Sequence, residues 1–208
     1  MMTNKQKIPQ ILDYLDEILP NVGCELNYQK DYELVIAVML SAQTTDASVN
    51  AVTAHFFIDY PTLESLANAK LEDIEEEIHS IGLFKNKARN IIGIAQTLIN
   101  EFNGVVPSDK ELLQHLPGVG NKSAGVVRAE IFKIPDLPVD THILRISKRL
   151  GLASKEDDPY EVEQKLKKLI NEDRWIKTHH QLIHFGRYHC TAKKPVCESC
   201  KLAHICHK

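Results

Sequence analysis

The chain has little of what a membrane or secreted protein requires. Its longest unbroken apolar run, from Leu34 to Leu40, is far shorter than the roughly 20 residues of a membrane-spanning helix. The amino-terminal residues lead directly into an amphipathic segment, without the apolar stretch of a secretory signal. We therefore expect a cytoplasmic protein with no membrane partner.

Strand-like alternation of apolar and polar residues is also nearly absent, whereas apolar residues recur at helical spacing along most of the chain. The segment 31–40 is so uniformly apolar that its periodicity does not separate a buried helix from a strand. Elsewhere the pattern predicts an all-α protein of roughly ten short helices. Helix-end signals occur at several places: closure at Asn103-Gly104 and at Gly151, N-caps at Asp31 and at Ser108 with Glu111 after it, and an N-cap at Asp158 before Pro159.

The net charge of −3 neither indicates nor excludes a polyanionic partner. The distribution of charge is more informative, because residues 177–208 contain six Lys or Arg and one acidic residue, Glu198. A basic end of this kind is either a surface that faces phosphates or an ordinary solvated face.

Cysteine is scarce except near the end of the chain. Four of the five cysteines, Cys190, Cys197, Cys200 and Cys206, form the pattern C-x6-C-x2-C-x5-C. In a reducing cytosol such a group more often binds metal than forms disulfides. Zinc prefers paired C-x2-C motifs, and the single pair here favours an iron–sulfur cluster, with zinc as the alternative. Cys24 is isolated, and we expect it to be a small buried core residue.

The sharpest motif is the run from Leu116 to Lys122, Leu-Pro-Gly-Val-Gly-Asn-Lys. Gly118 and Gly120 permit a tight turn with exposed backbone N–H groups before the next helix, which is a site for an anion such as phosphate. Val119 can anchor the turn in the core. The pattern favours a DNA-binding helix-hairpin-helix over a plain connection between helices. Lys122 is then either a phosphate contact or a nucleophile that attacks a sugar C1′.

A carboxylate follows in the run Val139-Asp140-Thr141-His142. Asp140 directly precedes a predicted helix, so one role is N-capping. A capping carboxylate is also held rigidly, which suits the stabilisation of a cationic sugar. His142 is either structural or in contact with substrate.

An internal repeat links the hairpin to an upstream segment. Residues 78–87 and 113–122 both predict a helix, a tight turn, an Asn-Lys pair and a second helix.

The hairpin, the Asp140 segment and the terminal cysteines, in this order, resemble the endonuclease III family over essentially the whole chain. This family comprises bifunctional DNA glycosylases of the helix-hairpin-helix, Gly/Pro-Asp superfamily. The resemblance implies an all-α fold with a six-helix domain over residues 24–133. It also implies a discontinuous four-helix domain, residues 1–23 and 134–208, with a [4Fe–4S] cluster on the four cysteines. The DNA cleft would lie between the domains.

By the same resemblance, Lys122 is the nucleophile and Asp140 the essential carboxylate. Gln43 corresponds to the residue that enters the gap left by a flipped nucleotide, and Leu83 to an intercalating side chain. Without the family, Gln43 would be an unremarkable polar residue and Leu83 a core leucine. Asn121 departs from the family pattern, in which Arg is frequent, and this departure puts one backbone contact in doubt.

The function implied is base-excision repair of damaged pyrimidines, with strand cleavage by β-elimination through a lysine Schiff base. The expected partner is double-stranded DNA with damaged bases or abasic sites, bound by a monomer that is nucleoid-associated if bacterial. The alternatives are a monofunctional adenine-mismatch glycosylase, which typically lacks the lysine at position 122, and a non-catalytic DNA-binding module with a zinc clasp. Further DNA contacts are expected at Gly118, Val119, Gly120, His142, Lys193 and Lys194.

Overall fold

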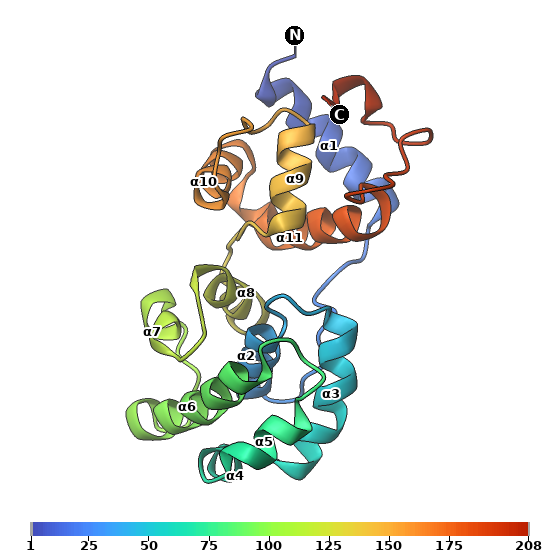
Figure 1. Cartoon of the computed structure of the whole chain (residues 1–208). Coiled ribbons are helices and arrows are strands. Elements are labelled where there is room, and N and C mark those ends of the chain that lie inside the picture. Colours follow the sequence, from blue (N-terminus) through green and yellow to red (C-terminus); the bar gives the residue numbers. More distant parts are fainter. Residues whose placement is uncertain (1, 208) are drawn as a thin grey trace. The chain divides into compact units, whose positions relative to one another are not determined.

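Helices make up the regular structure of the computed structural model, which describes residues 2–207 and has no strand among them (Figure 1). The prediction of an all-α fold is confirmed. The α-helices are α1 (Asn4–Ile18), α2 (Asp31–Leu40), α3 (Asp46–Asp59), α4 (Leu63–Ala67), α5 (Leu71–Glu77), α6 (Phe84–Phe102), α7 (Lys110–His115), α8 (Asn121–Phe132), α9 (Thr141–Arg149), α10 (Pro159–Leu169) and α11 (Trp175–His184). Within the described range, no helix is long and apolar enough to cross a membrane.

The chain divides into two units, one of Glu25–Phe132 and one of Met1–Cys24 with Lys133–Lys208. The first holds the seven helices α2 to α8, one more than the six expected. Helix α2 is its centre: every residue from Tyr32 to Leu40 is buried, and α3, α6 and α8 pack around it (Figure 1). The ambiguous apolar segment is thus a buried helix.

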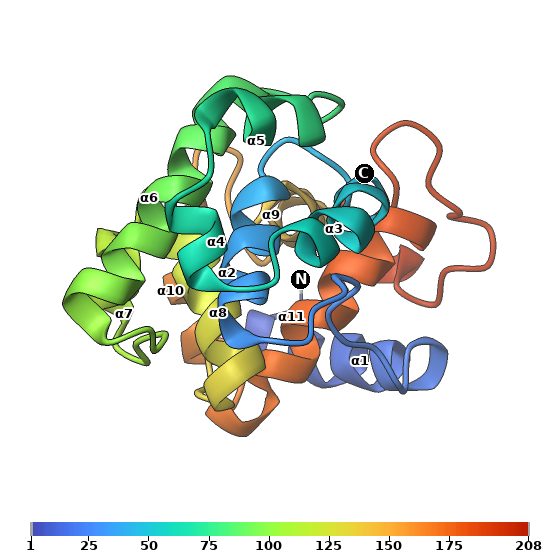
Figure 2. The same cartoon turned by 90° about the horizontal axis from the view of Figure 1, so that it is seen from below.

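The second unit joins the two ends of the sequence. Ile11 and Leu15 of α1 share a buried core with Ile143 of α9, Leu182 of α11 and Ile205. Figure 2 shows α1 and α11 side by side, and the two helices are in contact.

An ion-pair network ties the same two helices together. Arg174 binds both carboxylate oxygens of Asp16, at 2.9 and 3.1 Å, and Lys177 lies 2.7 Å from the same group. The hydrogen bonds from Arg174 and Lys177 hold the pKa of Asp16 well below its usual range.

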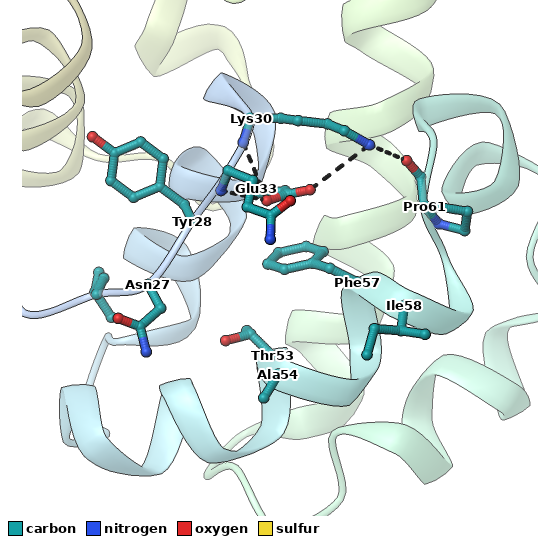
Figure 3. Close-up of a pocket in the computed structure, with 11 residues that line it drawn as sticks. Asn27, Tyr28, Lys30, Glu33, Thr53, Ala54, Phe57, Ile58 and Pro61 are labelled. Atoms are coloured by element: carbon teal, nitrogen blue, oxygen red, sulfur yellow. Dashed lines mark hydrogen bonds and ion pairs between the residues drawn. The ribbon is translucent and has the colours of Figure 1, made fainter.

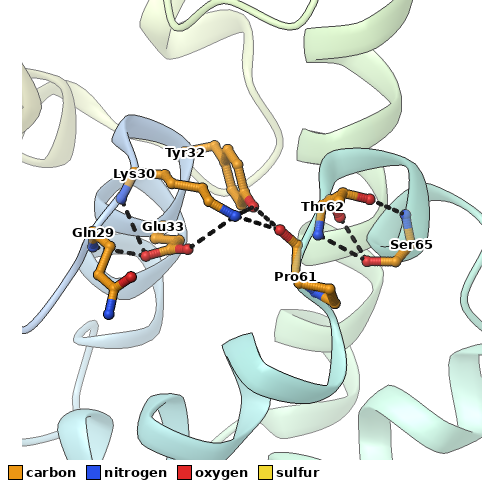
Figure 4. Close-up of polar contacts among 7 residues, drawn as sticks. All are labelled: Gln29, Lys30, Tyr32, Glu33, Pro61, Thr62 and Ser65. Carbon is orange, nitrogen blue, oxygen red and sulfur yellow. Dashed lines mark hydrogen bonds and ion pairs between the residues drawn. The ribbon is translucent and has the colours of Figure 1, made fainter.

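The start of α2 is fixed by a side chain that folds back on it. The carboxylate of Glu33 accepts hydrogen bonds from the backbone N–H groups of Gln29 (2.7 Å) and Lys30 (3.2 Å), while Lys30 Nζ and the Tyr32 hydroxyl both donate to Pro61 O (Figure 4). Beside this network lies a hollow of about 580 Å³ (Figure 3). Its lining, which includes Phe57 of α3, contains none of the residues proposed above for DNA contact or catalysis.

The helix-end signals are accurate to within a few residues. Asp158 caps α10 by accepting from Glu161 N, with Pro159 at the first helical position, as predicted. Asn103 and Gly104 close α6 with φ of 53° and 76°. The N-cap prediction for Ser108 is wrong, since Asp109 accepts the amides of Glu111 and Leu112 instead.

The cap predicted at Asp31 is off by one residue, because Asp31 is the first residue of α2 and Lys30 is its N-cap. The core role expected for Cys24 is wrong as well, because this residue is only partly buried.

Candidate active site and metal centre

The glycine turn joins α7 to α8 in the geometry of a helix-hairpin-helix. Val119 is buried and its N–H donates to Leu116 O (3.1 Å), so it anchors the turn as expected. Gly118 has φ of 76°, and a Cβ on it would lie 2.3 Å from the Asn90 amide nitrogen. A Cβ on Gly120 would meet nothing within 4 Å, so the backbone here is open to an approaching group.

Lys122 lies in the first turn of α8, directly behind this open glycine, and its side chain is exposed. The backbone N–H groups of the first helical turn have no acceptor within the helix and point toward its amino end. Together with the partial positive charge of the helix terminus, they favour an anion beside the lysine. The position therefore combines an accessible amine with a helix terminus that is suited to an anion.

The first copy of the repeat presents an apolar tip at the matching position. Leu83 stands 35 residues before Gly118, and both residues adopt left-handed backbone, with φ of 62° and 76°. Leu83 is 59% exposed, whereas the neighbouring Ile81 is buried. The interpretation of Leu83 as a core leucine is wrong, and an exposed apolar side chain on a strained turn is suited to insertion between bases.

Gln43 occupies a second strained turn, between α2 and α3. Its φ is 58° and its side chain is exposed, while Thr45 after it caps α3 through Ser48 N (3.2 Å). A left-handed conformation costs a residue with a side chain on the order of 1 kcal/mol or more, so the surrounding contacts must hold it.

Asp140 caps α9, as one of its two predicted roles requires. Its Oδ1 accepts a hydrogen bond of 2.8 Å from Ile143 N. The segment before it is anchored on both sides of Leu137: Pro138 O pairs with His179 Nδ1 at 3.0 Å, and Asp136 binds Lys167 at 2.5 Å. The carboxylate is therefore fixed in position and orientation by the buried part of its own unit.

His142 points back into its unit. Its Nδ1 accepts from Arg145 Nη2 at 3.3 Å, and its Cβ would lie only 2.7 Å from a Cβ placed on Gly186. These contacts favour the structural one of its two predicted roles.

The four clustered cysteines line one cavity of about 370 Å³, together with Arg149, Phe185 and Leu202. Among residues 2–207, no three His, Cys, Asp or Glu side chains are arranged to hold a single metal ion. Four thiols spaced around a cavity of this size suit a cluster, whose iron and sulfide core fills the volume between them. Burial raises the pKa of the Cys200 thiol, and positively charged iron favours the thiolate form there.

Two arginines of α9 hold the segment that carries the first of these cysteines. Arg149 Nη1 donates to Cys190 Sγ at 3.2 Å and to Thr191 O at 2.8 Å. Arg145 Nη2 donates to Cys190 O at 3.1 Å and to Gly186 O at 2.8 Å. The helix capped by Asp140 is thus bonded directly to the cysteine loop.

Comparison with known proteins agrees with this geometry. Residues 36–172 match the HhH-GPD superfamily of base excision DNA repair proteins, and residues 190–206 match the iron-sulfur binding domain of endonuclease III. Endonuclease III of Bacillus subtilis (strain 168) is 44% identical over 207 residues, which cover 100% of this chain and 94% of that protein. The chain belongs to the endonuclease III family.

Two solved structures of this family share the fold closely. A non-covalent endonuclease III–DNA complex and a trapped endonuclease III–DNA covalent intermediate each superpose with a TM-score of 0.96 at 48% identity. They cover 100% of this chain, which in turn covers 96% and 97% of theirs.

The family membership makes the protein a DNA-binding base-excision repair glycosylase with a [4Fe–4S] cluster, and it confirms the predicted enzyme class and cofactor. The zinc alternative is wrong, because the cysteine segment matches an iron–sulfur domain.

The hairpin geometry predicts unequal effects of two alanine substitutions. Gly118→Ala introduces a strained φ and a clash with Asn90, and should lower the free energy of unfolding by about 1–3 kcal/mol. The matched Gly120→Ala adds a methyl group in open space and should change it by less than about 0.5 kcal/mol. Urea unfolding of both variants measures the difference, and equal losses would contradict the geometry.

The cavity predicts which cysteines bind the cluster. Cys200→Ser should abolish the visible iron–sulfur absorption of the purified protein and its bound iron, because it removes one of four ligands. Cys24→Ser should leave both unchanged, since Cys24 lies outside the cavity lining. Retention of full colour by Cys200→Ser would show that this thiol is not a ligand.

Proposed function

We propose that this glycosylase removes damaged pyrimidines from double-stranded DNA and cleaves the strand, with Lys122 as nucleophile and Asp140 as the essential carboxylate. The observation that carries the proposal is the exposed Lys122 amine in the first turn of α8, behind the open backbone at Gly120. It is supported by the trapped covalent complex with DNA of a protein 48% identical to this chain. A covalent intermediate requires a nucleophile on the protein.

The reaction begins when the damaged nucleotide leaves the stack, which costs a few kcal/mol and less for a poorly stacked base. The Lys122 amine attacks C1′, the C1′–N bond breaks, and the base departs with the bonding electrons. Loss of the amine proton and opening of the sugar leave a Schiff base. Removal of a C2′ proton then expels the 3′ phosphate oxygen, so the strand is cut by β-elimination.

Asp140 supports the step in which positive charge develops on the sugar. Because Ile143 N fixes its Oδ1, the carboxylate does not have to reorganise as the charge forms. A preorganised charge of this kind stabilises the transition state more than a mobile one does. Asp140 also favours proton transfer from the attacking amine.

In the unit Glu25–Phe132, the DNA contacts come from exposed groups. Gln43 and Leu83, on left-handed turns, fill the space vacated by the flipped nucleotide. The backbone of Gly118 to Gly120 approaches a phosphate. Asn121 does not alter this phosphate contact, because the groups that bind the phosphate are backbone N–H groups and not its side chain.

The cysteine loop contributes charge rather than reacting atoms. Cys190, Cys197, Cys200 and Cys206 hold the [4Fe–4S] cluster, which when bound supplies a rigid core for the loop between the first two cysteines. Lys193 and Lys194 lie exposed on that loop and face the DNA backbone in this proposal. We also propose that the protein acts as a monomer in the cytoplasm, at the nucleoid if bacterial.

The nucleophile is tested by reductive trapping. Wild-type protein incubated with borohydride and a duplex that contains an abasic site should form a covalent adduct, because the reagent reduces the Schiff base. Lys122→Ala should form none, whereas Lys85→Ala, which removes an exposed lysine of α6, should trap at the wild-type level. Denaturing gel electrophoresis separates the adduct from free DNA.

Asp140→Asn completes this experiment. It should lower the rate of base release by about 100-fold or more, since the fixed charge at the sugar is removed while the cap oxygen remains. Absence of any adduct with the wild-type protein would refute the lyase proposal.

The role of the basic loop is tested by salt dependence. Lys193→Ala with Lys194→Ala should weaken duplex binding and reduce the slope of log K against log salt by up to about 1.8, or 0.9 for each phosphate that the loop no longer neutralises. Fluorescence anisotropy at several salt concentrations gives the slope. An unchanged slope would mean that the loop does not approach the DNA backbone.

A further inference from the structure

A buried lysine of α6 lies between the two strained turns and has no part in the chemistry described so far. Lys87 is 4% exposed and stands in the position of the first hairpin that matches Lys122 in the second. Its ammonium donates to Leu40 O (2.8 Å), to Ala42 O (2.8 Å) and to Thr44 Oγ1 (3.1 Å). An ammonium has three N–H donors, so each of them has an acceptor.

Two of these three acceptors stand on either side of Gln43. Ala42 precedes it and Thr44 follows it, so one cation holds both neighbours of the residue with φ of 58°. Leu40 O is also the last carbonyl of α2, where the carbonyls lack helical donors and favour a positive charge. Lys87 therefore closes α2 and fixes the turn that presents Gln43.

The backbone of Lys87 reaches the other turn. Its N–H donates to Leu83 O at 3.1 Å, an acceptor that it shares with Asn86 N, and Leu83 is the N-cap of α6 with φ of 62°. A single residue is therefore bonded through its side chain to the Gln43 turn and through its backbone to the Leu83 turn. The two turns are separated by 40 positions in the sequence and have no other shared partner among the hydrogen bonds described above.

Burial of a charged group raises the free energy of the folded protein, because the group loses its hydration. Burial lowers the pKa of Lys87 from its ordinary value, and an aliphatic residue of the same length would fill the space without that penalty. The three oxygen acceptors offset part of the cost, in an arrangement in which Gln43 is left-handed.

We propose that Lys87 is a positioning residue that sets the Gln43 and Leu83 turns as one unit, so that both side chains enter the DNA together. The proposal rests on the roles of Gln43 and Leu83 in the proposed function. Lys87 itself makes no contact with DNA, because its side chain is buried and its three N–H donors already have acceptors within the protein.

The test compares a paired and an unpaired substrate. Lys87→Met keeps an unbranched side chain that is one atom shorter, and removes the cation. It should slow single-turnover release of dihydrouracil from a duplex by about tenfold or more, because a small misplacement of positioning groups costs up to about 100-fold. Strand cleavage at an abasic site in single-stranded DNA needs no insertion into a duplex, and should change less than about twofold.

Lys85→Met is the matched control, because it makes the same change in charge two residues away on an exposed position of α6. It should not show the difference between paired and unpaired substrates. Urea unfolding of each variant establishes the conditions under which it is fully folded.

A double-mutant cycle separates positioning from general destabilisation. In a Gln43→Ala/Leu83→Ala background the side chains to be positioned are gone, so Lys87→Met should lower base release by less than about twofold. Where Lys87→Met does not fold, Thr44→Val replaces it, since it removes one of the three acceptors and leaves the lysine in place. The same pattern is then expected at smaller amplitude.

Two results would overturn the proposal: equal losses on the paired and unpaired substrates, or a loss in the Gln43→Ala/Leu83→Ala background as large as in the wild type. Either would make Lys87 an ordinary structural lysine. Failure of the wild-type protein itself to release the base or cleave the abasic strand would refute the proposed function instead.

Discussion

The backbone groups at helix ends are the constraint around which this site is built. A helix leaves its first N–H groups and its last C=O groups without partners, and each must find one elsewhere or remain open to a ligand. Asp140 satisfies the start of α9, and Lys87 satisfies the end of α2. The start of α8 is left open at Gly120, beside Lys122. Residues that complete a helix end are held rigidly, and an end left open is available to bind phosphate.

In the unit formed by both ends of the chain, α9 links the proposed chemistry to the cofactor. Asp140 is at its first turn, and Arg145 and Arg149 extend from its later turns to the loop that begins at Cys190. The helix is 9 residues long, so the carboxylate and the cysteine loop are rigidly related within this unit. The cluster can therefore affect Asp140 through the stability of α9, without taking part in the reaction.

Sequence patterns predicted those features that depend on neighbouring residues. The cap at Asp158, the closure at Asn103-Gly104 and the burial of Val119 all follow from local backbone chemistry. The N-cap predicted at Ser108 was wrong, because the neighbouring Asp109 caps equally well and is the residue that accepts the first amides of α7.

Local sequence patterns could not predict the two left-handed turns or the buried lysine. Nothing local marks Leu83 or Gln43 for positive φ, since leucine and glutamine, unlike glycine or asparagine, are uncommon in the left-handed region and need surrounding contacts to hold them there. Lys87 reads as an ordinary helical lysine because its acceptors lie more than 40 positions earlier in the chain. The repeat aligned it with Lys122, but the two lysines have opposite environments, one buried and one exposed.

The joining of the chain's two ends has a consequence for synthesis on the ribosome. The unit Glu25–Phe132 is continuous, so it can fold as soon as it emerges. Helix α1 is made before this unit, yet its core partners, such as Leu182, Leu202 and Ile205, are made after it. At roughly 5–20 residues per second, we expect α1 to remain exposed for many seconds while the rest of the chain is translated. The cluster forms only after Cys206 has been made, so the apolar face of α1 stays open to aggregation until its own partners have been translated.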